Sequence, residues 1–169
     1  MSAHSLSRDL TGVSGGQGGS LLLLKAMLET AEVRRQLTHR LAELRKAQSQ
    51  RRSAGEAARA AFDTVLEREI APTVRQFAQA LKAEGFAFSV QTPASTVRLV
   101  SDRSSDNVID IVLELGATQP TVMVRSAFTR GRRQLEDERV LAQGDGIAAL
   151  DGERVLAVLL DVIEPFVER

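Results

Sequence analysis

The chain has 169 residues, 22 basic and 22 acidic side chains, and no cysteine, so its formal net charge is zero. That length suits one ordinary domain with an appended segment. Zero net charge argues against bulk attraction to nucleic acid or to an anionic membrane, and the lack of cysteine excludes disulfides, thiol catalysis and cysteine-bound metals.

The first segment, residues 1–19, is rich in glycine toward its end and predicts a flexible tail. Residues 13–17 read VSGGQ, which is similar to the LSGGQ signature of ABC-type ATPases and contains the Gly-Gly-Gln tripeptide of translation release factors. The first resemblance implies a nucleotide phosphate held at a helix N-terminus. The chain contains no Walker A sequence, however, so the pattern favours a flexible tail over nucleotide chemistry.

Residues 20–55 are expected to form an N-terminal helical arm that begins with Ser20 as its N-cap. Apolar side chains recur along it at helical spacing, and we expect them to form the interface with a partner. These residues are Leu21, Leu24, Met27, Leu28, Ala31, Leu37, Leu41 and Leu44. The apolar run at residues 21–24 is far shorter than the ~20 residues of a membrane span.

Beyond Leu44 the sequence is polar and rich in alanine, and two interpretations remain open. Either one long helix continues, or residues 49–55 form a loop between two antiparallel helices of a hairpin. Helical periodicity returns at residues 62–81. Pro72 predicts a kink or break at residues 70–71, and Gly85 predicts a C-terminal cap with Phe86 as its apolar contact.

Residues 107–115 carry the strongest strand signal, because Ile109, Ile111, Leu113 and Leu115 alternate with a second set of side chains. We expect three further strands, at residues 86–90, 97–101 and 121–128. The short turns between them predict an antiparallel meander. In the expected register Leu99 lies opposite Ile109, and Arg98 lies opposite Asp110.

Residues 129–138 are interpreted as a charged loop, followed by a short hairpin of residues 139–142 and 147–150. Asp151 is the expected N-cap of the last helix. Its expected apolar face consists of Val155, Leu156, Leu159, Leu160, Ile163, Phe166 and Val167.

The predicted fold class is therefore α+β: a long N-terminal helix or helical hairpin, an antiparallel meander of four to six strands, and a C-terminal helix packed on the sheet. Three parts are expected: a tail at 1–19, the helical arm at 20–55 and an α+β globular domain at 56–169.

The charged residues are unevenly placed. Residues 34–59 contain eight Lys or Arg against two Glu, a net of +6, and residues 134–169 contain nine acids against three Arg, a net of −6. A basic helix of this kind could contact phosphates. The candidate anion or nucleic-acid contacts are Arg34, Arg35, Arg45, Arg51, Arg52, Arg130, Arg132 and Arg133.

Other chemistry has weaker support. His4 and His39 are isolated, so no metal site or cofactor is expected. The pairs Asp110 with Glu114 and Asp102 with Asp106 resemble polar strand and turn residues more than a desolvated acid/base pair.

The expected function is a non-catalytic, self-associating interaction or scaffold protein of the cytoplasm that assembles through its helical arm. The expected partner is a second copy in a homodimer, or another protein, with no membrane and no small-molecule substrate. The alternative is nucleic-acid association through the Arg-rich helix at 34–59. A third is a small hydrolase-like or composite-site enzyme.

Overall fold

The computed structural model describes residues 17–116 and 118–167, and it has the α+β architecture that the sequence predicts. The chain divides into two compact units, Met1–Gln48 and Ser49–Arg169. The first unit contributes the beginning of α1 (Gln17–Val65), and the second contains the end of α1 and every later element. The tail expected at 1–19 lies outside the described residues except for residues 17–19, which are helical.

Helix α1 resolves the choice between one long helix and a hairpin. It is continuous over 49 residues, so no loop interrupts it at residues 49–55. It begins at Gln17, and the predicted N-cap at Ser20 is therefore wrong. Gly55 lies within the helix and is buried, and a Leu115 methyl carbon lies 3.7 Å from where a Cβ of residue 55 would stand.

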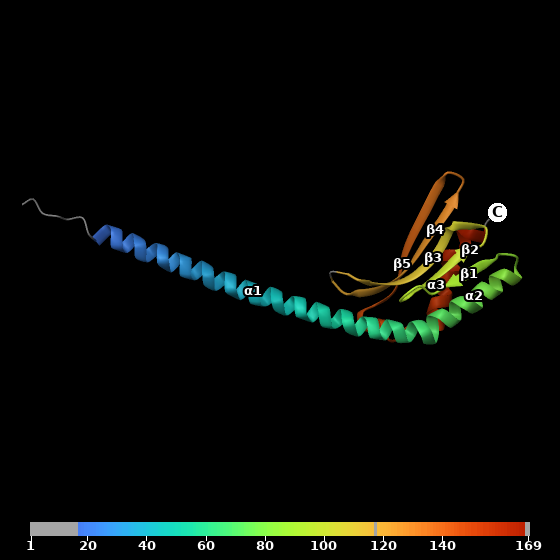
Figure 1. Cartoon of the computed structure of the whole chain (residues 1–169), viewed down its shortest axis with the longest axis horizontal. Helices are drawn as coiled ribbons and strands as arrows, with labels where there is room; N and C mark the ends of the chain where they lie inside the picture. Colours follow the sequence, from blue (N-terminus) through green and yellow to red (C-terminus); the bar gives the residue numbers. More distant parts are fainter. Residues whose placement is uncertain (1–16, 117, 168–169) are drawn as a thin grey trace, which may run out of the picture. The chain divides into compact units, whose positions relative to one another are not determined.

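The predicted break near Pro72 is confirmed. A single π-helical segment, Leu66–Ile70, separates α1 from α2 (Ala71–Ala83), and the helical path bends at this point in Figure 1. The Ala71 N–H donates to the carbonyl of Leu66, five residues back. Because proline lacks an N–H and clashes with the preceding turn, it is accommodated in the first turn of the new helix.

The end of α2 confirms the cap predicted at Gly85. Gly85 has φ of +89°, its N–H donates to the Lys82 carbonyl, and the Phe86 N–H donates to the Leu81 carbonyl at 2.8 Å. This pair of bonds is the Schellman motif, in which the left-handed residue is usually glycine.

Replacing Gly85 by alanine should lower the free energy of unfolding by ~1–2 kcal/mol, the cost of a left-handed conformation for a residue with a Cβ. No atom lies within 4 Å of the new methyl group, so the loss is conformational rather than steric. The urea midpoint should fall at unchanged slope. Gly146→Ala is the matched control, because Gly146 has equal space and no positive φ. Equal midpoints for the two variants would contradict this assignment.

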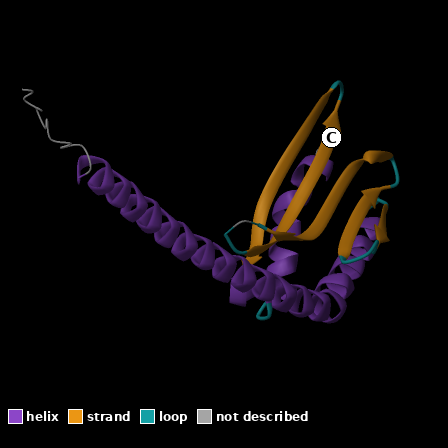
Figure 2. Cartoon of the chain, turned by 60° about the vertical axis from the view of Figure 1, so that its left-hand side comes forward, coloured by secondary structure: helices purple, strands orange, loops and turns teal. Residues whose placement is uncertain are grey.

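The sheet contains five antiparallel strands in chain order (Figures 1 and 2). Their bounds are β1 Phe88–Gln91, β2 Thr96–Ser101, β3 Ser104–Leu115, β4 Pro120–Arg130 and β5 Arg133–Gln143. The predicted register is confirmed, since Leu99 pairs with Ile109 and Arg98 pairs with Asp110.

Helices cover one face of the sheet. Helix α2 contacts β1 and β2, whereas α3 (Gly152–Val167) contacts β4 and β5. The core between the layers includes Phe62 from α1, Ile109 and Ile111 from β3, and Leu159 from α3. Phe166 of α3 closes one end, with its ring centroid 5.1 Å from that of Phe128 and 6.2 Å from that of Phe88.

The predictions for residues 129–150 are partly wrong. The expected charged loop is the end of a β-hairpin, in which Arg130 pairs with Arg133 across a two-residue turn containing Gly131 at φ +65°. Residues 139–142 belong to β5, and the expected second strand is absent because Gly144–Ile147 forms a 3-10 helix. Asp151 does cap α3, since its Oδ1 accepts a bond of 2.9 Å from the Arg154 N–H.

Candidate interaction surface

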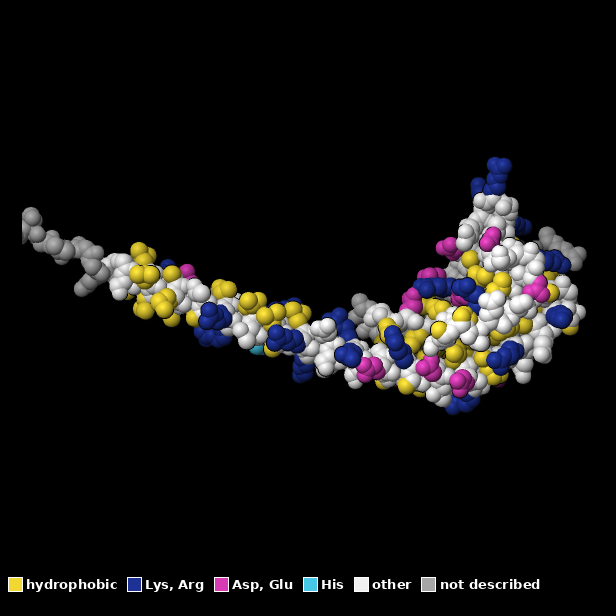
Figure 3. Space-filling model, viewed as in Figure 1, with side chains coloured by type: hydrophobic (Ala, Val, Ile, Leu, Met, Phe, Trp, Pro, Cys, Tyr) yellow, Lys and Arg dark blue, Asp and Glu magenta, His cyan; other side chains and the backbone are white. Residues whose placement is uncertain are grey.

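The apolar side chains of the arm are exposed to solvent in the single chain. Every described side chain from Gly18 to Lys46 is exposed. The leucines at 21–24, 28, 37, 41 and 44, with Met27 and Val33, are between 42% and 71% exposed. Figure 3 shows them as yellow groups along the helix, between dark-blue basic side chains. Large contiguous apolar patches are uncommon on the surfaces of monomeric soluble proteins.

Helical geometry divides the predicted interface residues into two stripes. With about 100° of rotation per residue, Leu21, Leu24, Leu28 and Ala31 share one side of α1. The other predicted residues, Met27, Leu37, Leu41 and Leu44, form a set whose centre lies roughly 130° around the helix from the centre of the first set. They belong to a second line of side chains, in which four- and three-residue steps alternate.

We call this second line the seam. It consists of Leu23, Met27, Thr30, Arg34, Leu37, Leu41 and Leu44. Alternating steps of three and four residues are the heptad pattern, in which the a and d positions face a neighbouring helix. Leu23 was missed in the sequence analysis, although stepping backward from Leu44 by heptad spacing reaches it.

The two polar side chains of the seam, Thr30 and Arg34, differ in their local interactions. The Thr30 Oγ1 donates to the Ala26 carbonyl at 2.8 Å, which leaves the oxygen's lone pairs able to accept a bond. Within residues 17–116 and 118–167, Arg34 has no ion pair. Arg35, by contrast, lies 3.0 Å from a Glu32 carboxylate oxygen, and Arg40 lies 3.3 Å from Glu43.

The candidate anion contacts are spread over both units. On α1, Arg34, Arg35 and Arg45 belong to the first unit, and Arg51 and Arg52 belong to the second. Arg52 is paired with Glu56 at 3.1 Å. Arg130, Arg132 and Arg133 form an exposed cluster around the β4–β5 turn, which is visible as the dark-blue group beyond the sheet in Figure 3.

Two of the candidate carboxylates, Asp110 and Glu114, lie in a row of ion pairs on the sheet face opposite α2 and α3. Asp110 accepts two hydrogen bonds from the Arg98 guanidinium, at 2.7 and 2.8 Å. These bonds, and to a smaller extent the negative charge of Asp110, raise the pKa of Arg98 above its ordinary value. Arg125 bonds both Glu114 and Glu138. The carboxylates therefore stabilise cross-strand pairing. Asp102 lies at the turn between β2 and β3, where its Oδ1 accepts a hydrogen bond of 2.6 Å from the Ser89 hydroxyl of β1.

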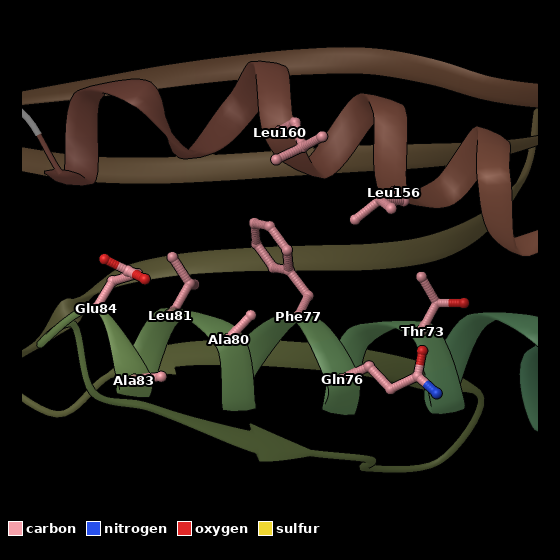
Figure 4. Close-up of a pocket in the computed structure, with 9 residues that line it drawn as sticks. All are labelled: Thr73, Gln76, Phe77, Ala80, Leu81, Ala83, Glu84, Leu156 and Leu160. Atoms are coloured by element: carbon pink, nitrogen blue, oxygen red, sulfur yellow. The ribbon is translucent and has the colours of Figure 1, made fainter.

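A groove between α2 and α3 is a feature that the sequence analysis missed. It encloses about 600 Å³, a size typical of ligand or side-chain pockets. Figure 4 shows Leu156 and Leu160 of α3 directed toward Phe77 and Leu81 of α2 across it. Leu160 was expected to be buried against the sheet but is 56% exposed, because the sheet-facing positions of α3 are Val155, Leu159, Val162 and Ile163.

The described residues place further limits on the site. Among residues 17–116 and 118–167, no group of three or more His, Asp or Glu side chains is arranged to hold a metal ion. In the same part of the chain, no helix combines the length and apolarity that crossing a bilayer requires.

Comparison of the chain with protein-family models, with curated proteins and with solved structures finds no match.

Proposed function

We propose that the protein is a non-catalytic interaction protein that assembles with a second copy of itself through its N-terminal helical arm. The observation that carries the proposal is the exposure of the arm's apolar residues in the single chain. Each leucine buried on association contributes ~1.5–3 kcal/mol. Micromolar affinity corresponds to ~8 kcal/mol. The apolar side chains of both arms must supply this and also offset ~4–15 kcal/mol of lost translational and rotational freedom.

The physics of isolated helices supports the same proposal. Helices in water are marginally stable without packing, because nucleation is costly and each residue added contributes little. Residues 18–46 are all exposed in the single chain. A partner that covers the apolar residues supplies the missing stabilisation, and a second identical chain offers an equivalent apolar surface.

The basic residues give less support to nucleic-acid association as the main function. Arg35, Arg40 and Arg52 are already compensated by neighbouring glutamates. Exposed helical ion pairs are common on solvated helices and do not by themselves indicate a phosphate-binding face.

The full chain should have a mass of twice its 18.3 kDa in light scattering at micromolar concentration, and the mass should fall toward that of one chain on dilution. Because the contact is mainly apolar, the dimer should persist at high salt, which screens charge interactions. A mass of one chain at every concentration up to ~1 mM, where association energy is only ~4 kcal/mol, would refute the proposal.

A further inference from the structure

We propose that the two arms associate antiparallel, with the two-fold axis near residue 32; this inference rests on the proposed self-association. It follows from the order of residues along the seam. In heptad notation Met27, Arg34 and Leu41 occupy a positions, and Leu23, Thr30, Leu37 and Leu44 occupy d positions. Arginine at the middle of the seam is the residue that decides orientation.

A parallel, in-register pair brings like charges together twice. Positions a face their own copies in such a pair, so Arg34 would meet Arg34 of the other chain inside the contact. The heptad positions e and g flank the seam on either side. There Arg40 of one chain, at position g, would lie beside Arg45 of the other chain, at position e of the next heptad, and the symmetry-related pair would form on the other side of the contact. Like charges directly opposed disfavour pairing. A parallel pair shifted by one heptad avoids the Arg34 contact but loses the closed two-fold symmetry of a dimer.

An antiparallel pair places a positions opposite d positions, and one register suits the seam from Leu23 to Leu41. When Arg34 faces Thr30 of the second copy, Leu41 faces Leu23 and Leu37 faces Met27, each pair occurring twice. The Thr30 hydroxyl, which donates to Ala26 within its own helix, has lone pairs available to accept a bond from the Arg34 guanidinium. Beside the seam, Arg40 of one copy lies next to Ala26 of the other, and Val33 lies next to Val33 of the other copy. No like charges are opposed at these g positions.

Neighbouring registers are poorer. Sliding the antiparallel pair by one heptad in one direction places Arg34 opposite Leu23, and in the other direction it places Arg34 opposite Leu37. Either shift leaves Leu41 without an apolar partner in the seam, because it then faces Thr30 or a position before Gln17. The register centred near residue 32 pairs Leu41 with Leu23 and Leu37 with Met27, and only Leu44 among the apolar seam residues then faces a polar residue, Ser20.

Cysteine cross-linking tests the orientation, because the natural chain has no cysteine. Leu23→Cys and a size-tagged Leu41→Cys chain are mixed in equal amounts, allowed to exchange and oxidised in a glutathione buffer. Disulfides require Cα atoms within about 7 Å. In the antiparallel pair Cys at 23 faces Cys at 41, whereas two Cys at 23 are about 27 Å apart along the helices. The expected result is roughly tenfold more cross-linked mixed dimer than either same-variant dimer.

The outcomes separate the two proposals. Cross-linking of Leu23→Cys to itself, in a chain that light scattering shows to be a dimer, would overturn the antiparallel arrangement and leave self-association standing. A dimeric mass with no disulfide in any mixture would overturn the register as well. A monomeric mass for the natural chain and for both cysteine variants would refute the proposed function itself. Circular dichroism of each variant checks that the helix content is unchanged.

Discussion

Replacing Leu37 by lysine should convert the dimer into a monomer at micromolar concentration. Leu37 lies in the seam and is 56% exposed in the single chain, so the substitution does not disturb the fold of that chain. In the dimer it removes two buried leucine side chains, each contributing ~1.5–3 kcal/mol. The dissociation constant should therefore rise roughly a hundredfold to ten-thousandfold. Sedimentation equilibrium over a dilution series measures it.

Gln36→Lys is the matched control, because it introduces the same charge one residue away on a different side of α1. Gln36 donates to a Glu32 carboxylate oxygen at 3.0 Å, and a lysine can form an ion pair with the same glutamate. Lysine, glutamine and leucine are all good helix formers, so neither substitution lowers helix propensity appreciably. Equal dissociation constants for Leu37→Lys and Gln36→Lys would show that charge, and not the seam, governs association.

Replacing Phe62 by alanine should lower the free energy of unfolding of residues 49–169 by ~3–5 kcal/mol. Phe62 is fully buried, and it joins the end of α1 to the core formed by the sheet, α2 and α3. The loss combines removal of a large apolar side chain from the core with the cavity left behind. Since domains of this size have total stabilities of ~5–15 kcal/mol, the variant is expected to lose roughly a fifth or more of its stability.

Hydrogen exchange of the β3 amides measures this loss, because central strands exchange mainly through global unfolding. The control is Asp63→Ala, an adjacent exposed position where the change should stay within ~0.5 kcal/mol. If Phe62→Ala and Asp63→Ala gave the same protection, the end of α1 would not belong to the folded unit. Self-association of the arm should be unaffected in both variants, since neither position lies in the seam.

The central sheet was predictable because its apolar residues alternate without interruption. Ile109 and Ile111 are both buried, as the period-two pattern requires, and the pairing with Leu99 follows from the short turn between β2 and β3. The caps at Gly85 and Asp151 were predictable for a related reason. Both depend on local backbone conformation or a local side-chain bond, which neighbouring residues in the sequence decide.

The outer half of the β4–β5 hairpin was not predictable from alternation. Residues of β5 from Arg133 to Val140 are exposed on both faces, so no apolar period marks them. Further along, a bulge opposite Val122 and Met123 places Leu141 and Ala142 in the core one after the other, which breaks the period of two. Pairing with β4, and not side-chain pattern, forms this strand.

The candidate interaction surface was likewise only partly predictable from the sequence. Composition and spacing along residues 20–44 identified an apolar helical arm, and its continuity through residues 49–55 required the structure. The division of these residues into two stripes, and the place of Leu23 in the seam, follow from helical and heptad spacing along the sequence. The groove between α2 and α3 could not be predicted, because Leu156 and Leu160 have the same spacing as the buried residues of α3.

The amino-acid sequence by itself determined the class of fold, the register of the central strands, two of the three predicted helix caps and the presence of an apolar arm. These features depend on periodicity and on interactions between residues close in the chain. Only the tertiary structure decided which apolar side chains remain exposed, whether the long helical region folds back, and where the fifth strand runs. Burial depends on which surfaces meet in space, and residues distant in the sequence supply those surfaces.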